Sequence, residues 1–152
     1  MRCDEGSRNP VTVAAVDSER LDGRATRFEH GVVALTLLAG FTFELPWTLP
    51  LAAGVTAVGA VFGPRGAPLV RVFVQMMGPR IPPAEVTADP TEWRWGAALE
   101  AAVLGLATLL MFGSLIGLAW ILGLAVAGID ALDGATGVNL SARVVRHGRE
   151  RR

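Results

Sequence analysis

The stretch that decides the fold is GAALEAAVLGLATLLMFGSLIGLAWILGLAVAGI, residues 96–129, which carries one charged side chain, Glu100, in thirty-four positions. A single α-helix of this length, rising about 1.5 Å per residue, would far exceed the ~30 Å hydrocarbon core of a bilayer. Gly113 and Ser114 lie near the middle of the stretch, and these residue types favour a turn. The stretch therefore predicts a hairpin of two membrane-spanning helices.

Local signals give the limits of this hairpin. Asp89 is suited to cap a helix, Pro90 to occupy its first position, and Glu92 to return a hydrogen bond to the cap. We therefore predict a third helix over 90–112 and a fourth over 115–129. The fourth is short for a membrane span.

A second apolar block lies upstream and has the same form. Residues 31–43 and 51–62 carry no charge, and between them come Glu44 and two prolines, Pro46 and Pro50. A continuous helix over 31–62 would be about 48 Å long, and the prolines would break it. We predict a first helix of about twenty residues from near Arg24, a turn, and a second helix that ends near residue 62 and is also short for a span.

Composition agrees with a membrane protein. Hydrophobic residues make up 51% of the 152 positions, charged residues only 18%, and the mean hydropathy is +0.43, which excludes a disordered chain. The 14 basic and 14 acidic residues balance, so net charge indicates no nucleic-acid partner. The single cysteine, Cys3, excludes a disulfide within the chain. We predict an all-α integral membrane protein with four transmembrane helices in two tandem hairpins.

Three other interpretations are compatible with the sequence. One hairpin with re-entrant segments, or a soluble helical protein, would also account for the short apolar blocks. A secretion signal would use Arg24 and Arg27 as its basic region and 31–43 as its apolar core. No small-x-small cleavage site follows residue 43, which favours an uncleaved hairpin.

The chain divides into three segments. Residues 1–23 are polar or mixed and are expected to be disordered, 24–147 form the membrane domain, and 148–152 are a basic tail. Within the membrane domain the apolar blocks repeat at an offset of 67 positions, which gives repeats over 24–80 and 90–147. After each hairpin we expect a helix in the membrane interface, one over 67–77 and a counterpart beyond Asp133. An aqueous connecting helix is the alternative for the first of these.

The repeat brings two stripes of small residues into register. Residues four positions apart in the second helix match such residues in the fourth, namely Ala52, Thr56 and Ala60 against Ala119, Gly123 and Ala127. Small residues let membrane helices approach closely. We therefore predict that the second and fourth helices pack against each other, although an Ala- and Gly-rich chain also produces such stripes by chance.

The arginines indicate the orientation. Five precede the first apolar block, four lie between the two blocks, five follow the second block, and neither hairpin turn contains one. By the positive-inside rule both termini and the central loop are cytoplasmic, and we expect a multi-pass protein of the bacterial inner membrane. The arginines of the tail would bind anionic lipid head groups or fix the topology: Arg143, Arg146, Arg149, Arg151 and Arg152.

Glu100 is the candidate functional carboxylate, because a charge inside an apolar block must be paired, protonated or exposed to a wet cavity. The preferred interpretation is an ion pair with Arg27 or Arg94 near the cytoplasmic surface. The functional alternative is a carboxylate that binds a proton or another cation. Asp130 and Asp133 are expected to act as interfacial anchors or helix caps.

No motif points to catalysis or to a cofactor. The sequence has no phosphate-binding glycine loop, no Gly-x-Ser-x-Gly and no Cys-x-x-Cys. His30 and His147 have no further ligand at a metal-binding spacing on one helix face, since Glu29 is adjacent to His30 and points elsewhere. We therefore predict a protein that is not an enzyme, with no catalytic residue, no cofactor and no metal site.

Several short motifs follow one another in a characteristic order. They are Arg27-Phe28, Leu45-Pro46-Trp47, a Phe-Gly-Pro-Arg-Gly-x-Pro segment at 62–68, a Gly-Pro-Arg-x-Pro-Pro loop at 78–83, and Arg94-Trp95. This order resembles that of a family of small bacterial, actinobacterial-type, four-helix integral membrane proteins of unknown function, over about residues 24–146. Many members carry a Gly-Phe-Cys-x-x-Cys-Glu segment after the last helix, which implies thiol redox or metal chemistry. Here residues 137–143 read GVNLSAR, so the resemblance carries no catalytic residue over.

The expected function is non-enzymatic. We predict a scaffold or accessory subunit that lies in the lipid bilayer and packs against another membrane protein or itself, without nucleic acid. Two alternatives belong to other classes. A small proton-coupled transporter would need Glu100 in a wet cavity, and a membrane thiol-redox component would need cysteines that this chain lacks.

Overall fold

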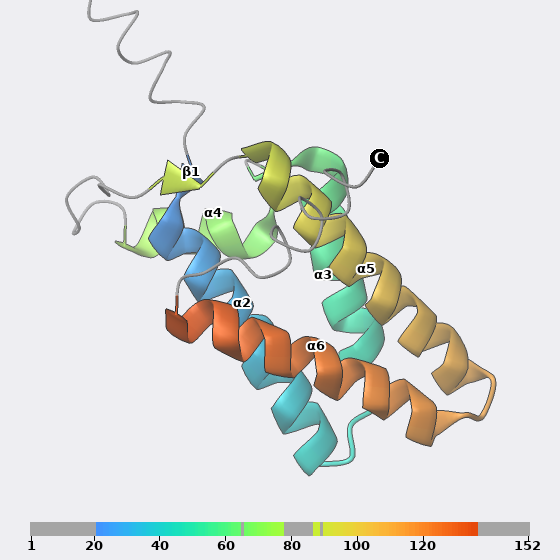
Figure 1. The fold of residues 1–152 in the computed structure, drawn as a ribbon. Helices are drawn as coiled ribbons and strands as arrows, with labels where there is room; N and C mark the ends of the chain where they lie inside the picture. Colours follow the sequence, from blue (N-terminus) through green and yellow to red (C-terminus); the bar gives the residue numbers. More distant parts are fainter. Residues whose placement is uncertain (1–20, 65, 78–86, 89, 137–152) are drawn as a thin grey trace, which may run out of the picture.

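Four long helices dominate the computed structural model, which describes residues 21–64, 66–77, 87–88 and 90–136. In chain order the elements are β1 (Leu21–Asp22), α2 (Gly23–Thr42), α3 (Thr48–Phe62), α4 (Pro68–Met77), β2 (Thr87–Ala88), α5 (Pro90–Phe112) and α6 (Ile116–Thr136). Figure 1 shows α2, α3, α5 and α6 in one bundle, with α4 beside the end at which α2 begins. The predicted all-helical architecture is thus confirmed apart from the two short strands, which pair antiparallel.

The helix limits follow the local sequence signals in three of the four long helices. The observed bounds of α2 and α5 agree with the predicted first and third helices, and α3 ends at the residue before Gly63, whose φ of 71° ends the helix. The prediction for the fourth helix is wrong at its end. α6 continues to Thr136 rather than stopping near residue 129, so Asp130 and Asp133 lie within it.

Each long helix has two principal neighbours around the bundle. α3 packs mainly against α5, α6 packs mainly against α2, and α5 and α6 pack along their hairpin. The two helices of each repeat-matched pair, α2 with α5 and α3 with α6, therefore lie on the diagonals. α3 and α6 are not principal neighbours, since α3 packs mainly against α5 and α6 mainly against α2, so the predicted approach of α3 to α6 is across the diagonal of the bundle.

Most residues of the two small-residue stripes lie in the interior of the bundle. Ala52, Thr56, Ala119, Gly123 and Ala127 are buried, whereas Ala60 is partly buried beside α4 and α5. A Cβ atom on Gly123 would lie 2.7 Å from Leu49 Cδ2. α3 and α6 therefore approach each other across the diagonal at Gly123, which has no side chain. The apolar core draws on all four helices: Val33, Leu37, Leu49, Ala52, Leu104, Ala107, Ala119, Val126 and Ala127.

The two hairpin turns have the same geometry. The amides of Phe43, Glu44 and Leu45 donate hydrogen bonds to the carbonyls of residues 39, 41 and 40, and those of residues 113–115 repeat this pattern to residues 109, 111 and 110. Glu44 and Ser114 occupy the matching positions with φ of 55° and 64°. The predicted offset of 67 holds where α2 and α5 begin, but it is 70 at the turns, because α5 has 23 residues and α2 has 20.

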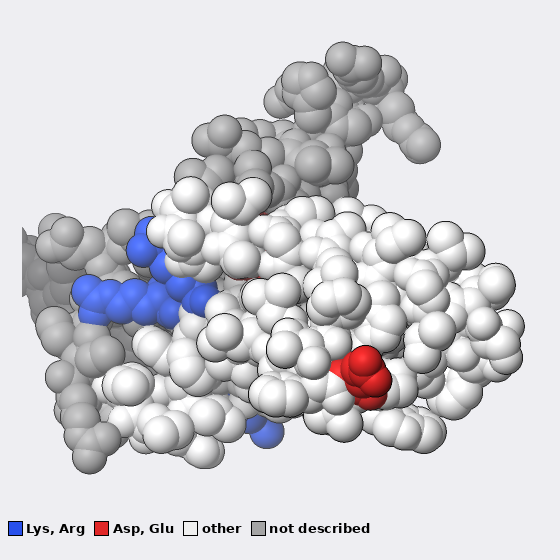
Figure 2. All heavy atoms as spheres, turned by 90° about the horizontal axis from the view of Figure 1, so that it is seen from below, with Lys and Arg blue, Asp and Glu red and all other residues white. Residues whose placement is uncertain are grey.

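Apolar side chains cover the outside of the bundle. Leu35, Val61, Leu109 and Ile121, one from each long helix, are 69%, 67%, 70% and 63% exposed. Two helices, Thr91–Phe112 and Ile116–Thr136, are long and apolar enough to cross a membrane, whereas α3 has only 15 residues. Figure 2 shows a face on which most of the visible arginine surface lies toward one end, one acidic patch lies away from it, and the rest is mostly uncharged.

The helix predicted over 67–77 is present as α4, and one of its faces packs against the bundle. Val70 is buried, and the Phe73 ring lies against Phe28 of α2 with centroids 5.4 Å apart. Of the predicted disordered segment 1–23, residues 1–20 fall outside the described residues, whereas Leu21–Asp22 form β1 and Gly23 begins α2. The Asp89 cap, the residues from 137 on that were expected to form the counterpart helix, and the basic tail also fall outside the described residues. The pairing of β1 with β2 joins Leu21 to Ala88 and was not predicted.

Candidate cation site

Polar side chains gather inside the half of the bundle that lies away from the turns. They come from three helices: Glu29 and His30 from α2, Trp93 and Glu100 from α5, and Asp130 and Asp133 from α6. Four of the six are almost fully buried, since Glu29, Trp93, Asp130 and Asp133 are 5%, 3%, 2% and 3% exposed. Ionisable groups so enclosed need partners or a functional reason.

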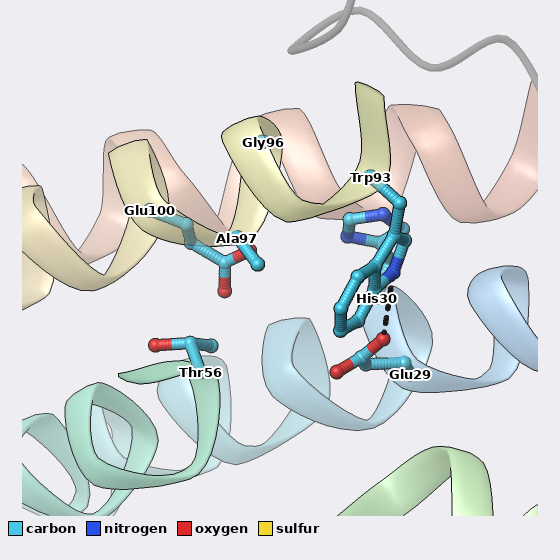
Figure 3. Close-up of a pocket in the computed structure, with 7 residues that line it drawn as sticks. All are labelled: Glu29, His30, Thr56, Trp93, Gly96, Ala97 and Glu100. Carbon is cyan, nitrogen blue, oxygen red and sulfur yellow. Dashed lines mark hydrogen bonds between the residues drawn. The ribbon is translucent and has the colours of Figure 1, made fainter. Parts of the chain in front are cut away.

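A small cavity lies between these helices. Its lining consists of Glu29, His30, Thr56, Trp93, Gly96, Ala97 and Glu100, shown in Figure 3. The cavity volume is about 10 Å³, which is room for one water molecule or an ion of similar size. The Thr56 hydroxyl donates to the carbonyls of residues 52 and 53 in its own helix, so only its oxygen lone pairs remain for the cavity.

Glu29 is fixed by a hydrogen bond from a neighbouring helix. Trp93 Nε1–H donates to Glu29 Oε2 over 3.2 Å in a buried contact, drawn dashed in Figure 3. The Trp93 ring packs closely against Gly59, where a Cβ atom would lie only 3.0 Å from ring atom Cη2. The contact joins α2 to α5 across the diagonal and holds the Glu29 carboxylate toward Trp93.

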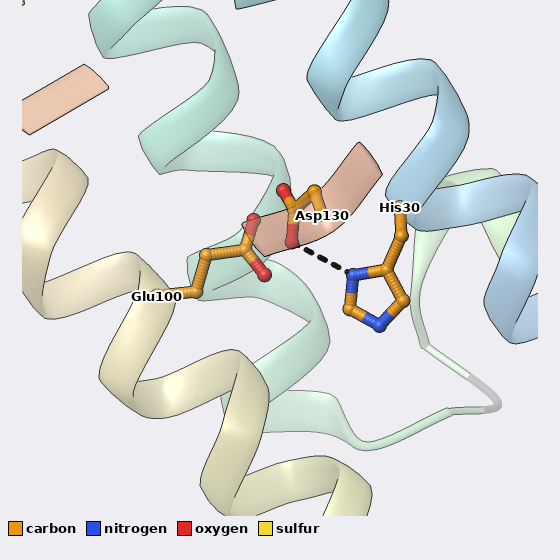
Figure 4. Close-up of side chains that lie close together, drawn as sticks. All are labelled: His30, Glu100 and Asp130. Carbon is orange, nitrogen blue, oxygen red and sulfur yellow. Dashed lines mark hydrogen bonds and ion pairs between the residues drawn. The ribbon is translucent and has the colours of Figure 1, made fainter. Parts of the chain in front are cut away.

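His30 and Asp130 form the central ion pair. The His30 Nδ1–H donates to Asp130 Oδ1 over 3.0 Å, and the two side chains are 12% and 2% exposed. Figure 4 shows the Glu100 carboxylate directed at the same point from α5. One potential ligand atom from each of His30, Glu100 and Asp130 lies within 4.8 Å of the others. We call these three residues the cluster.

The predicted ion pair of Glu100 with Arg27 or Arg94 is wrong. Both arginines are exposed, and Arg94 Nη2 donates to the carbonyl oxygen of Val61 at the end of α3, 3.4 Å away. Within the described ranges, the charged neighbours of Glu100 are His30 and carboxylates, and its Oε1 atom has no hydrogen-bond partner. Glu100 therefore faces the interior, as the functional alternative required.

Asp130 and Asp133 are not the interfacial anchors or caps that their place in the sequence indicated. Both are buried, because α6 continues past them and turns the same face toward the bundle. The buried positions of α6 are spaced by three and four residues: Ala119, Gly123, Val126, Ala127, Asp130 and Asp133. The two aspartates thus extend the small-residue stripe, and this helical spacing is the signal in the sequence that could have indicated their burial.

The sequence predicted no metal site because no set of possible ligands shares one helix face. Glu29 and His30 do diverge as expected, one toward Trp93 of α5 and the other toward Asp130 of α6. The possible ligand set arises instead from three helices, and its members are 30 residues or more apart in the chain. Only tertiary packing brings imidazole nitrogen and carboxylate oxygens together here.

One sequence signal linked two of the three cluster residues. His30 precedes Glu44 by fourteen positions, and Glu100 precedes Ser114 by the same number. When the repeats are aligned on their turns, His30 and Glu100 are therefore counterparts on the diagonal helices α2 and α5. Equal distance from equivalent turns places both side chains at the same depth in the bundle.

The chain matches a protein-family model described as Domain of unknown function (DUF4395) over residues 21–145, and it belongs to this family. The match confirms the resemblance to a family of unknown function that the loop motifs indicated. No curated protein and no solved structure matches the chain. The matched range includes residues 137–143, where this sequence has no cysteine.

Proposed function

We propose that this protein is a small multi-pass membrane protein that binds a cation inside its four-helix bundle. The observation that carries the proposal is the cluster, in which side chains from α2, α5 and α6 reach one point. Ionisable groups inside membrane helices are costly, and they mark ion sites, proton relays and ligand sites. A scaffold needs no such cluster, so cation binding takes precedence over the scaffold function expected from the sequence.

The charge of this region also favours a cation. Glu29, Glu100, Asp130 and Asp133 contribute four carboxyl groups to this region, and the basic His30 is paired with Asp130. Buried carboxylates that lie together cost free energy unless positive charge compensates them. A cation bound among them supplies that charge and gives the polar half of the bundle a function.

A position in the bilayer is supported by the outer surface. α5 and α6 are long and apolar enough to span, and α2 and α3 each pack against one of these two. α2 and α3 also expose large apolar side chains, such as Leu35 and Leu51, at 69% and 61%. We propose that all four helices enter the inner membrane, where apolar outer faces are solvated by lipid.

The proposed orientation puts both termini and the central loop in the cytoplasm. The fourteen arginines avoid both turns, and most of the arginine surface visible in Figure 2 lies toward one end of that face. Reporter fusions at residues 25, 85 and 150 should be active on the cytoplasmic side, and fusions at 47 and 114 on the outer side. A periplasmic signal at residue 85 would contradict this topology.

Cation binding is tested by thermal unfolding of the purified full-length protein in detergent. The chelator-treated protein is heated with Na⁺, K⁺, Mg²⁺, Ca²⁺, Mn²⁺ or Zn²⁺ in separate samples. At least one cation should raise the Tm, because a ligand at 100 times its Kd stabilises the folded state by about 2.7 kcal/mol.

Two variants decide where the cation binds. Asp130→Asn should abolish the rise in Tm, since it removes a buried charge of the cluster. Glu44→Gln should retain it, because Glu44 is exposed in the first turn. If no cation raises the Tm, or if Asp130→Asn responds like the wild type, the scaffold function becomes the better explanation.

A further inference from the structure

We propose that the cation is a divalent first-row transition-metal ion, held by His30 Nδ1 and by one carboxylate oxygen each of Glu100 and Asp130. This inference rests on the proposed cation-binding function and names the chemical class of the ion. The three side chains come from α2, α5 and α6, so the ion would join three of the four long helices at one point.

The donor atoms are already close to a coordination geometry. They lie within 4.8 Å of one another, and His30 Nδ1 is 3.0 Å from Asp130 Oδ1. Two ligand atoms of a tetrahedral ion, each about 2.1 Å from it, are about 3.4 Å apart. The proposed site requires the Glu100 carboxylate to approach the other two ligands to that separation. Figure 4 shows all three groups directed inward.

Unpartnered oxygen atoms in the cluster point independently to a ligand. Asp130 Oδ2 and Glu100 Oε1 have no hydrogen-bond partner in the described part of the chain, although Asp130 is only 2% exposed. Buried carboxylate oxygens are normally satisfied, because their removal from water is costly. A metal ion uses these lone pairs directly.

The donor set selects the class of metal. Mg²⁺ and Ca²⁺ prefer shells made of oxygen, and Ca²⁺ takes six to eight oxygen ligands at once. One imidazole with two carboxylates, and no thiolate among the three, suits Zn²⁺, Mn²⁺, Fe²⁺ or Co²⁺ better than Cu⁺. The adjacent cavity of about 10 Å³ has room for one water molecule as a further ligand.

Charge balance is consistent with a divalent ion. The Nδ1–H of His30 now donates to Asp130, and the ion would take the place of that proton between the two side chains. Within the ligand set itself, two carboxylates and a neutral imidazole together neutralise a charge of +2, and the buried carboxyl groups of Glu29 and Asp133 lie outside this set. Glu29 is not a ligand in this arrangement, because Trp93 Nε1–H holds its carboxylate in the neighbouring contact.

The test is a titration of the purified full-length protein in detergent with Co²⁺, whose visible d–d absorption reports its ligands. All proteins carry Cys3→Ser and His147→Gln, which remove the other cysteine and histidine ligands of the chain, and no polyhistidine tag is used. We expect one Co²⁺ per chain and full displacement by Zn²⁺. Zinc K-edge absorption of the loaded protein should show nitrogen and oxygen ligands with one imidazole.

Variants of the three ligands should weaken binding, and matched controls should not. His30→Gln, Glu100→Gln and Asp130→Asn should each raise the Kd for Co²⁺ at least about 100-fold. Glu44→Gln, an exposed carboxylate, should stay within about threefold. Glu92→Gln, which changes an exposed carboxylate in the first turn of α5, should also stay near the wild type. Tryptophan fluorescence and the Tm of each variant confirm that it is folded.

The outcomes separate the metal class from cation binding itself. Absence of Co²⁺ and Zn²⁺ binding, or equal binding by wild type and Asp130→Asn, overturns the transition-metal site. If Mg²⁺, Ca²⁺ or a monovalent cation then stabilises the wild type but not Asp130→Asn, cation binding stands and the class of ion is wrong. If no cation stabilises the wild type, both proposals fail.

Discussion

The half of the bundle next to the two turns and the half that holds the cluster are built from the same four helices, yet their interiors differ. Near the turns the buried side chains are apolar, and the largest of them are Leu37, Leu49 and Leu104. At His30 and Glu100, each fourteen positions from its turn, the interior becomes polar.

This difference separates the stability of the bundle from its proposed function. Small and aliphatic residues near the turns allow close helix packing, which stabilises helices in a membrane. The polar half has less apolar packing of this kind. Its buried charges also cost more free energy than apolar side chains of similar volume would. A chain that only had to fold would not need Glu29, His30, Glu100 and Asp130 inside.

The largest expected effect on stability comes from replacing His30, the basic residue of the polar half. His30→Leu leaves Asp130 and Glu100 close together without their basic partner. We expect the free energy of unfolding of the metal-free protein to fall by about 3–5 kcal/mol. SDS-induced unfolding in mixed micelles after chelation measures this change.

A double substitution provides the control for that result. His30→Leu with Asp130→Leu replaces the whole ion pair by apolar side chains, which is often neutral or stabilising. The double variant should therefore recover most of the stability that His30→Leu loses, while binding no metal. A double variant as unstable as the single one would mean that the polar half is needed for folding.

The next effect concerns the apolar half. Gly123→Leu forces a side chain into the space occupied by Leu49, whose Cδ2 atom lies 2.7 Å from the new Cβ position. We expect a loss of about 3 kcal/mol in the free energy of unfolding. Gly117→Leu is the matched control in the same helix, since nothing lies within 4 Å of its Cβ position. Equal losses would contradict a special role for the stripe.

A smaller effect is expected at the boundary between the cluster and α4. Trp93→Phe keeps a ring in place but removes the donor to Glu29, which is 5% exposed. The orphaned carboxylate should cost about 1–2 kcal/mol, measured by the same unfolding assay. Trp95→Phe changes an exposed ring two positions away and should cost less than about 0.5 kcal/mol. Similar values for the two variants would mean that the hydrogen bond contributes little.

The smallest effect tests the equivalence of the two turns. Glu44 and Ser114 adopt left-handed backbone angles that cost residues with a Cβ atom about 1–2 kcal/mol. Glu44→Gly and Ser114→Gly remove this strain but increase the freedom of the unfolded chain, so each should gain about 0.5 kcal/mol. The Tm of each variant checks this prediction, and a decrease at either turn would contradict it.

Local residues in the sequence predicted most of the helix ends. Pro90 at a first helical position and Gly63 after a last one mark ends through their backbone restrictions, which act without the rest of the fold. The end of α6 was mispredicted because Asp130 interrupts the apolar run. Hydropathy reports the surroundings of a side chain, whereas the backbone hydrogen bonds of α6 continue to Thr136.

The site was only partly accessible from the sequence. Glu100 was recognised because it is the single carboxylate in an apolar block. A charge in such a block is costly whichever helices pack around it. His30 was rejected as a metal ligand and Asp130 was expected to be an interfacial anchor or cap, because their local context is only a neighbouring Glu29 or the end of an apolar run. Their proximity depends on α2 packing against α6, which no local pattern specified.

Apolar runs, turn residues and arginine positions in the chain are therefore enough to specify helices, hairpins and an all-α architecture, because these depend on interactions between residues close in sequence. The choice of neighbours depends on contacts between distant helices. Tertiary packing put α3 against α5 and α6 against α2, so the repeat-matched helices lie on the diagonals. That arrangement turns one face of each of α2, α5 and α6 toward a common axis, where His30, Glu100 and Asp130 meet.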